Sequence, residues 1–253
     1  MSIFDLTDKI AIVIGGSGGI GHTLAVALAK AGADVVVSSR RLDKLEPVAE
    51  EIHALGKKSL AVSVDVTQEQ SVADMVTHVL KEFPRIDILV NTAGLIIRKP
   101  AESIPIDEWQ KVMDVNARGT FICCQAVAQT MIKQHAGKII NMSSVRGAYG
   151  DLLGAVAYSP SKGAINILTK TLACEWAKYN ILVNAIAPTI VETDLTRGAL
   201  TDPAFAQRIK ARIPLGRWAT PEDIVGPTLF LASNASDFIT GQIIYVDGGT
   251  TTW

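Results

Sequence analysis

The chain has 253 residues, of which 48% are hydrophobic and 19% are charged, a composition typical of a globular protein with a sizeable core. Its 24 basic and 25 acidic side chains give a formal net charge of -1. Such a balance offers no excess positive charge to attract nucleic acid or an anionic membrane, so neither partner is expected.

Short runs rich in Val and Ile alternate with amphipathic segments along the whole chain. The apolar runs have strand length and span 10–15, 34–39, 58–64, 86–91, 137–143, 181–187 and 242–247. Apolar residues at three- and four-residue spacing predict helices over 20–31, 42–55, 68–82, 107–134, 156–179 and 221–232. Because the strands are apolar almost throughout, both faces of the sheet should be buried. We therefore predict a single-domain α/β protein over 1–253, with a doubly wound parallel sheet (Rossmann fold) and helices on both faces.

The glycine-rich stretch GGSGGIG at 15–21 follows the first predicted strand and contains G-x-G-x-x-G. Glycines permit a tight turn and let backbone N–H groups approach a diphosphate at a helix N-terminus. The alternative is a merely flexible connection. The position of the loop, between a buried strand and an amphipathic helix, favours a dinucleotide site.

The end of the second predicted strand indicates which nucleotide binds. Ser38, Ser39, Arg40 and Arg41 provide hydroxyls and guanidinium groups but no carboxylate, which suits the 2'-phosphate of NADP better than the free ribose of NAD. The alternative is a solvated cluster at the start of the next helix. Asp65 ends the third strand, where it could accept a hydrogen bond from the adenine amino group or cap the helix beginning near 68.

Tyr158 and Lys162 lie four residues apart in AYSPSKGAINILTK, so a helix places them on one face. Pro160 fits only the first turn of that helix, which should begin just before it. A cation close to a phenol favours the phenolate, so we expect Lys162 to lower the pKa of Tyr158 towards neutrality for proton exchange with a substrate hydroxyl. Ser144 follows the strand over 137–143, where its hydroxyl can orient a carbonyl.

The segment 188–220 interrupts the alternation, and its Thr, Pro and Gly content predicts loops around a short helix that encloses the substrate. The N-terminal sequence lacks the pattern of a secretory signal, and no apolar run has membrane-spanning length, so a cytoplasmic protein is expected. Cys123, Cys124 and Cys174 lack metal-ligand spacing and are interpreted as buried thiols; no metal site is predicted.

Motifs along essentially the whole chain resemble those of the short-chain dehydrogenase/reductase family. They are Gly15, Gly19-Ile20-Gly21, Asp65, Asn91-x-Ala93-Gly94, Asn116 in DVNARGTF, Ser144, Tyr158-x-x-x-Lys162, Pro188 and Thr193. Within the family, AGLIIRKP and the stretch from RIPLGRWATPEDI to YVDGG resemble the gluconate 5-dehydrogenase and 2-deoxy-gluconate 3-dehydrogenase branch. Three positions depart from the family pattern: Ile14 replaces a threonine, Thr92 an asparagine and Thr189 a glycine.

The resemblance implies an NAD(P)-dependent oxidoreductase acting on CH–OH groups. It implies that Tyr158 exchanges the proton, Lys162 binds the nicotinamide ribose, Ser144 orients the substrate oxygen and Asn116 supports a water-linked proton relay. The expected cofactor-binding residues are Gly15, Ser17, Gly19, Ile20, Gly21, Ser39, Arg40, Asp65, Val66, Asn91, Ala93, Gly94, Tyr158, Lys162, Pro188, Val191 and Thr193. For Ser144 and Asn116 the alternatives are a strand-end cap and a hydrogen bond at a helix kink.

Two arginines are candidates for holding a substrate carboxylate, together with Ser144 and Tyr158. Arg98 follows the fourth strand and Arg146 lies two residues after Ser144; the alternative is that both are solvated loop residues. We therefore predict NADP-linked oxidation of a sugar acid or polyol. A 3-oxoacyl-thioester (acyl-carrier-protein) reductase is the alternative enzyme, and a non-catalytic NADP-binding scaffold is the alternative of another class.

The resemblance also implies a homotetramer, assembled through the long helices over 107–134 and 156–179 and through the C-terminal strand. Apolar positions around more than one face of these helices fit burial on two sides.

Overall fold

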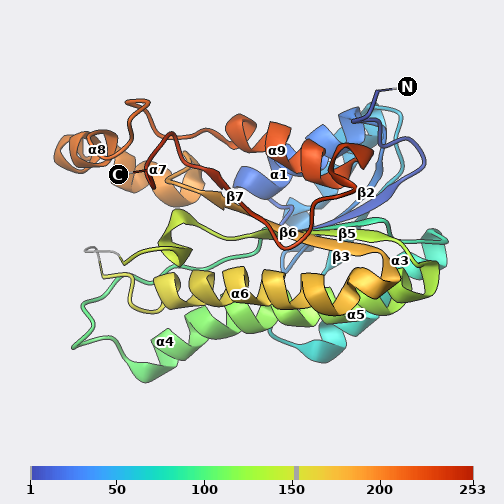
Figure 1. Cartoon of the computed structure of the whole chain (residues 1–253), viewed down its shortest axis with the longest axis horizontal. Coiled ribbons are helices and arrows are strands. Elements are labelled where there is room, and N and C mark those ends of the chain that lie inside the picture. The colour runs from blue at the N-terminus through green and yellow to red at the C-terminus, as the bar shows by residue number, and fades with distance from the viewer. Residues whose placement is uncertain (1, 151–153, 253) are drawn as a thin grey trace.

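A seven-stranded parallel sheet forms the centre of the protein (Figure 1). The structure is a computed structural model that describes residues 2–150 and 154–252. The strands are β1 (Ile10–Ile14), β2 (Asp34–Ser39), β3 (Ser59–Ser63), β4 (Ile88–Asn91), β5 (Gly137–Met142), β6 (Ile181–Pro188) and β7 (Ile243–Val246). Their order is β3-β2-β1-β4-β5-β6-β7, so the chain reverses direction across the sheet between β1 and β4. This confirms the predicted doubly wound sheet and places a ligand crevice at the carboxyl ends of these strands.

Helices cover both faces of the sheet (Figure 1). One layer contains α1 (Gly19–Lys30), α2 (Glu46–Ala54) and α9 (Val225–Ala232). The other contains α3 (Glu69–Glu82), α5 (Gly119–Gln134) and α6 (Tyr158–Trp176). Because side chains alternate along a strand, Val13 packs into the first layer and Ile12 into the second, and both are fully buried.

Shorter helical pieces complete the chain. They are α4 (Ile106–Met113), a π-helical turn (Asp114–Arg118) and 3-10 turns at Leu42–Lys44, Val145–Gly147, Ala177–Tyr179, Pro221–Ile224 and Asn234–Ser236. The helix predicted over 107–134 is thus divided by the π turn, which contains Asn116. The backbone oxygen of Asn116 accepts a hydrogen bond from the Thr120 hydroxyl at 2.6 Å.

The segment 188–220 contains two helices, α7 (Asp194–Leu200) and α8 (Pro203–Lys210), so the prediction of one short helix is wrong. The second helix starts afresh because Asp202 caps it, accepting a hydrogen bond from the Ala204 N–H at 3.0 Å, and Pro203 suits its first turn. Both helices lie at one end of the molecule, beyond the carboxyl end of β6 (Figure 1).

The three thiols do not share one environment. Cys123 and Cys124 are buried, and burial raises the pKa of the Cys123 thiol to about 12. Cys174 is exposed on α6, so the expectation that all three are buried is wrong for that residue.

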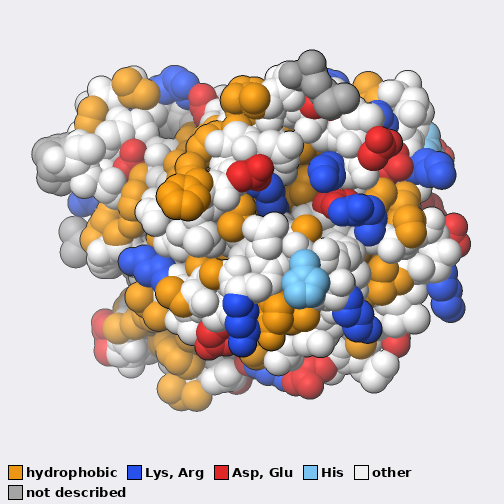
Figure 2. All heavy atoms as spheres, turned by 45° about the vertical axis from the view of Figure 1, so that its right-hand side comes forward, with side chains coloured by type: hydrophobic (Ala, Val, Ile, Leu, Met, Phe, Trp, Pro, Cys, Tyr) orange, Lys and Arg blue, Asp and Glu red, His pale blue; other side chains and the backbone are white. Residues whose placement is uncertain are grey.

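The described residues contain no membrane-spanning helix and no candidate metal-binding cluster. Within 2–150 and 154–252, no helix combines the length and apolarity needed to cross a bilayer. Across the same ranges, no cluster of His, Cys, Asp and Glu is arranged to hold a metal ion. Figure 2 shows basic and acidic side chains interspersed over one face of the molecule.

Candidate active site

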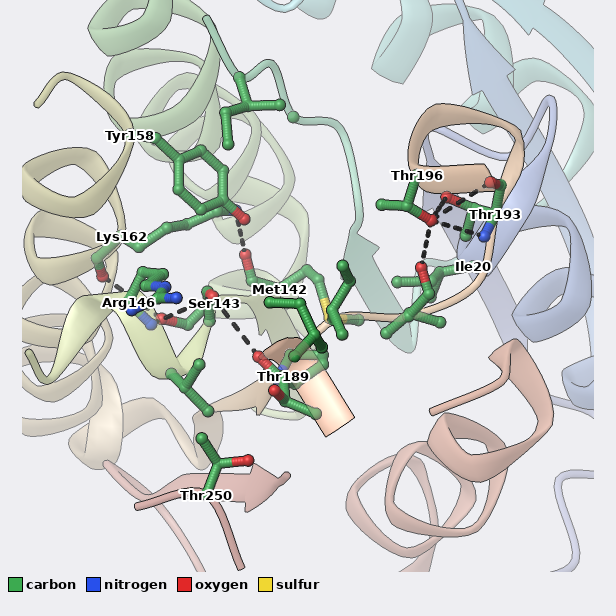
Figure 3. A pocket seen from close by; sticks show the side chains of 18 of the residues that line it. Ile20, Met142, Ser143, Arg146, Tyr158, Lys162, Thr189, Thr193, Thr196 and Thr250 are labelled. Atoms are coloured by element: carbon green, nitrogen blue, oxygen red, sulfur yellow. Dashed lines mark hydrogen bonds between the residues drawn. The ribbon is translucent and has the colours of Figure 1, made fainter. Parts of the chain in front are cut away.

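A cavity of about 340 Å³ lies beyond the carboxyl ends of β4, β5 and β6. Figure 3 shows part of its lining, with Tyr158, Lys162 and Arg146 on one side and Thr193 and Thr196 on another. The structure brings ten of the expected site residues to this cavity. They are Ile20, Gly94, Arg98, Ser144, Arg146, Tyr158, Lys162, Pro188, Val191 and Thr193.

Tyr158 and Ser144 both line the cavity, and a side-chain hydrogen bond from Ser144 acts on the Tyr158 hydroxyl. Tyr158 is the first residue of α6, and Ser144 follows β5. The Ser144 hydroxyl also accepts a hydrogen bond from the Arg146 N–H at 3.2 Å and lies 3.4 Å from the carbonyl oxygen of Pro188, to which it can donate. Two groups able to exchange or share a proton therefore meet where a substrate oxygen can reach both.

Burial raises the pKa of Tyr158 above its ordinary value, because desolvation disfavours the phenolate. The hydrogen bond from Ser144 and the charges of Arg98 and Arg146 oppose this shift without reversing it. The expectation that Lys162 lowers the pKa of Tyr158 is therefore wrong when only the protein's own groups act on the phenol. A protonated phenol is the form that can donate to a carbonyl oxygen.

Lys162 lines the cavity, and its ammonium group is hydrogen-bonded to the backbone. Its Nζ donates to the Met142 carbonyl oxygen at 2.7 Å and lies 5.5 Å from the centre of the Tyr158 ring. Burial lowers the pKa of Lys162 to about 8, since desolvation penalises the ammonium. This ammonium is one turn from Tyr158, as the spacing predicts, and its nearest acceptor is a strand end rather than the phenol.

Asn116 lies behind the cavity wall and does not line the cavity. Its Oδ1 accepts a hydrogen bond from the Leu95 N–H at 2.7 Å, and its Nδ2 donates to the Leu95 oxygen and to the Ser161 hydroxyl, both at 2.9 Å. The side chain thereby joins the loop after β4 to the residue beside Lys162. Asn116 thus positions the loop after β4 and the first turn of α6, and the π turn sets the orientation of its side chain.

The glycine loop has the shape that a diphosphate requires. Gly15 and Gly19 have φ values of +84° and +51°, which only glycine adopts freely. A Cβ at Gly21 would strike the carbonyl oxygen of Gly15 and would come within 2.7 Å of the Thr92 hydroxyl. Above Gly18, by contrast, the space within 4 Å is open. The first N–H groups of a helix have no partners inside it, so the open glycine loop at the start of α1 fits the diphosphate of a dinucleotide.

Two of the departures from the family pattern contact one another. The carbonyl oxygen of Ile14 accepts hydrogen bonds from the Thr92 N–H at 2.9 Å and from the Thr92 hydroxyl at 2.7 Å. The Ile14 side chain is buried in the core. A side-chain hydrogen bond from Thr92 therefore joins the end of β4 to the end of β1, just before the glycine loop. The third departure, Thr189, lines the cavity.

The candidate ribose and adenine residues lie at the ends of β2 and β3. Ser39 ends β2, Arg40 is exposed beside it, and the two strands are neighbours in the sheet. Hydrogen bonds from Thr67 hold the pKa of Asp65 below its ordinary value, and the nearby charge of Arg40 adds to this. The Asp65 carboxylate accepts from the Thr67 N–H and hydroxyl, whereas α3 begins at Glu69 without a side-chain cap. The alternative role of Asp65 as a helix cap is therefore wrong.

Eleven expected residues do not line the cavity. They are Gly15, Ser17, Gly19, Gly21, Ser39, Arg40, Asp65, Val66, Asn91, Ala93 and Asn116. Most of them lie at or just beyond the carboxyl ends of β1, β2 and β3, including the start of α1, where an extended dinucleotide would lie. Asn91 differs, because its buried amide donates to Asn141 at 2.9 Å and contacts Cys124, on the side of the sheet covered by α5.

Three arginines line the cavity, and sequence analysis named two of them. Arg146 also donates from Nη1 to the Gly150 oxygen at 3.1 Å and lies over the Tyr149 ring. Arg212, which was missed, follows α8 and lines the cavity together with Phe205 and Ile209. Phe205, Ile209 and Arg212 all lie in the segment 188–220, which the sequence predicted to enclose the substrate. The helices in this segment are too short for their periodicity to indicate which side chains face the cavity.

Comparisons with known proteins agree along the whole chain. A family model described as Enoyl-(Acyl carrier protein) reductase matches residues 15–251. The chain is 36% identical over 248 residues to 5-keto-D-gluconate 5-reductase of Escherichia coli (strain K12), covering 98% of this chain and 97% of that protein. It is 39% identical over 245 residues to a 3-oxoacyl-[acyl-carrier-protein] reductase of Aquifex aeolicus (strain VF5), covering 96% and 98%.

A solved structure is also similar to this chain over almost its whole length. A gluconate 5-dehydrogenase from Burkholderia cenocepacia J2315, in complex with NADP and tartrate, superimposes with a TM-score of 0.95 and 38% identity, covering 99% of this chain and 98% of that one.

Proposed function

Because the chain belongs to the short-chain dehydrogenase/reductase family, we propose that it transfers hydride between NADP and a carbonyl or secondary alcohol of a sugar acid or polyol. The chain is an oxidoreductase acting on CH–OH groups. The observation that carries the proposal is the hydrogen-bonded pair of Tyr158 and Ser144 in a cavity also lined by Arg98 and Arg146.

In this proposal Tyr158 moves the proton and Ser144 holds the substrate oxygen. During reduction the protonated phenol donates to the carbonyl oxygen; during oxidation the phenolate takes the proton from the alcohol. The bound nicotinamide supplies or accepts the hydride. The glycine loop would hold the diphosphate, and Lys162 would hold the ribose beside the nicotinamide. Asn116 positions the Leu95 loop against α6, so that substrate and proton donor meet in one geometry.

A carboxylate on the substrate is supported by the two arginines near the proton donor. Both charges act on Tyr158 and both residues line the cavity. Guanidinium groups bind carboxylates through two parallel hydrogen bonds, which would orient the acid as well as attract it. The similarity to 5-keto-D-gluconate 5-reductase and to the gluconate 5-dehydrogenase agrees with this substrate class.

Reduction of a 3-oxoacyl thioester is a second candidate. It is favoured by the apolar part of the lining, which includes Ile190, Phe205 and Ile209, and by the similarity to the Aquifex reductase. An acidic carrier protein would need a basic docking surface, whereas the face in Figure 2 mixes both signs of charge.

Consumption of NADPH by the purified protein separates the two candidates. We expect turnover with 5-keto-D-gluconate or a related keto sugar acid, and little with an acetoacetyl thioester. Turnover of the thioester alone would transfer the assignment to acyl-chain reduction. Cofactor binding without turnover of either compound class would support a scaffold instead.

The preference for NADP depends in this proposal on Arg40. An aspartate there would repel the 2'-phosphate and could accept a hydrogen bond from a free ribose hydroxyl. We expect Arg40→Asp to lower the ratio of kcat/KM with NADPH to kcat/KM with NADH roughly tenfold or more. Steady-state kinetics with both cofactors would measure this, and an unchanged ratio would remove Arg40 from the 2'-phosphate site.

We also propose that the protein forms a homotetramer. Apolar side chains are exposed on the elements expected to pair, including Phe121 on α5, Ile167 on α6 and Tyr245 on β7. Light scattering at micromolar concentration should give four times the chain mass of 27.0 kDa. A monomeric mass would contradict this assembly.

A further inference from the structure

Thr189 is a cavity residue to which the proposed reaction gives no role. It directly follows β6, it lines the cavity (Figure 3), and its side chain is half-buried. Among the residues that the structure describes, the Thr189 hydroxyl has no hydrogen-bond partner. The other Ser and Thr side chains of the lining all form hydrogen bonds with protein groups; they are Thr92, Ser143, Ser144, Thr193, Thr196 and Thr250. The Thr189 hydroxyl therefore keeps its donor and its acceptor sites for a ligand.

Hydrogen bonds of the backbone hold Thr189 in place on both sides. The Thr189 N–H donates to the Val246 oxygen at 3.3 Å and so continues the pairing of β6 with β7. The carbonyl oxygen of the next residue, Ile190, accepts from the Ala219 N–H at 3.0 Å. Because threonine is β-branched, its side chain also has few orientations open to it on a fixed backbone. The hydroxyl is therefore preorganised, and a ligand would lose little entropy in ordering it.

The Thr189 side chain starts close to the group that is proposed to hold the substrate oxygen. The Ser144 hydroxyl oxygen lies 3.4 Å from the carbonyl oxygen of Pro188. The peptide bond from Pro188 to Thr189 is trans, which places that carbonyl oxygen about 3 Å from the Thr189 Cα. The Ser144 oxygen and the Thr189 Cα are therefore no more than about 6.5 Å apart. A substrate oxygen bonded to Ser144 thus brings the groups near the reacting carbon to the Thr189 side chain.

We propose that the Thr189 hydroxyl forms a hydrogen bond with a hydroxyl group of the substrate near the reacting carbon. This inference rests on the proposed sugar-acid function and adds a second feature that the cavity selects, a hydroxylated chain besides the carboxylate. An acyl chain would cover the Thr189 hydroxyl without pairing it, and covering an unpaired hydroxyl costs free energy. Thr189 is thus a specificity-determining residue that favours a hydroxylated acid over an acyl chain. Glycine, which Thr189 replaces in the family pattern, has no side chain for this contact.

Two keto acids of equal chain length isolate the contribution of the substrate hydroxyls. The compounds 5-keto-D-gluconate and 5-oxohexanoate share the carboxylate and the position of the carbonyl, but only the first carries hydroxyl groups. The test measures kcat/KM for both, with NADPH, in the wild type, Thr189→Val and Thr189→Ser. Valine keeps the β-branched shape and removes the hydroxyl, whereas serine retains the hydroxyl. Thr77→Val is the control for this substitution, because Thr77 lies on α3, outside the cavity, and its hydroxyl donates to the Ala73 oxygen at 2.9 Å.

We expect Thr189→Val to lower kcat/KM for 5-keto-D-gluconate about three- to tenfold, the range for loss of a neutral hydrogen bond. The same variant should leave kcat/KM for 5-oxohexanoate unchanged or raise it. Thr189→Ser and Thr77→Val should keep the wild-type preference, and the KM for NADPH should stay the same throughout. If 5-oxohexanoate is bound but not reduced, its inhibition constant against 5-keto-D-gluconate provides the same comparison.

The outcomes separate this inference from the proposed function. An equal change for both keto acids in Thr189→Val, no change for either, or an effect confined to the KM for NADPH would overturn the role of Thr189 in substrate recognition. Each of these results would leave the sugar-acid function intact. A wild type that reduces neither 5-keto-D-gluconate nor a related keto sugar acid would overturn the proposed function and this inference with it.

Discussion

Tyr158→Phe should lower kcat/KM by about 100-fold or more while leaving NADPH binding intact, because the ring stays and only the exchangeable proton is lost. The loss should appear in kcat, since the phenol acts when the substrate oxygen changes its charge. Single-turnover measurements of NADPH oxidation, together with a titration of NADPH binding, would separate the two effects.

Tyr179→Phe provides the control for this variant. Tyr179 packs near His135, away from the cavity, and loses the same hydroxyl on substitution. We expect near wild-type kinetics from it. Retention of activity in Tyr158→Phe would remove Tyr158 as the proton donor and would leave Ser144 as the group to test next.

Gly21→Ala should weaken NADPH binding by at least about tenfold and lower the free energy of unfolding by about 1–3 kcal/mol, the usual range for overpacking. The added methyl would meet the Gly15 carbonyl oxygen, which cannot withdraw without shifting the glycine loop. It would also meet the Thr92 hydroxyl, which is held by its hydrogen bond to the Ile14 oxygen. Fluorescence titration with NADPH and urea unfolding would measure the two consequences.

Gly226→Ala is the matched glycine control. Gly226 lies in α9, where an added Cβ meets nothing within 4 Å, so the substitution should be neutral or slightly stabilising. Similar NADPH affinity in both variants would show that the close packing at Gly21 is unrelated to cofactor binding.

Much of the architecture follows from local spacing in the sequence. The Val- and Ile-rich runs correspond to seven parallel strands, and the pairing of Tyr158 with Lys162 follows from helix periodicity. Pro160 correctly predicts where α6 begins. Such features depend on residues a few positions apart, and these are the distances over which backbone geometry alone fixes which side chains share a face.

Contacts between distant segments were not available from spacing. The hydrogen bonds between Thr92 and Ile14, 78 residues apart, turn two separate departures from a family pattern into one interaction. Asn116 holds Leu95 and Ser161 only because a π turn replaces part of a regular helix. Neither the register of β1 against β4 nor the π turn has a signal in residue periodicity.

The sequence by itself determined the fold class, the glycine loop and the placement of Tyr158 and Lys162 on one face of a helix, because each depends on local spacing. Only the tertiary structure decided the direction of the Tyr158 pKa shift and which residues line the cavity. Burial, rather than Lys162, sets the direction of the Tyr158 pKa, since desolvation depends on every segment packed around the phenol. Arg212 lines the same cavity as Arg98 and Arg146 for the same reason: it is 66 positions from Arg146 in the sequence, and only the packing of distant segments brings it there.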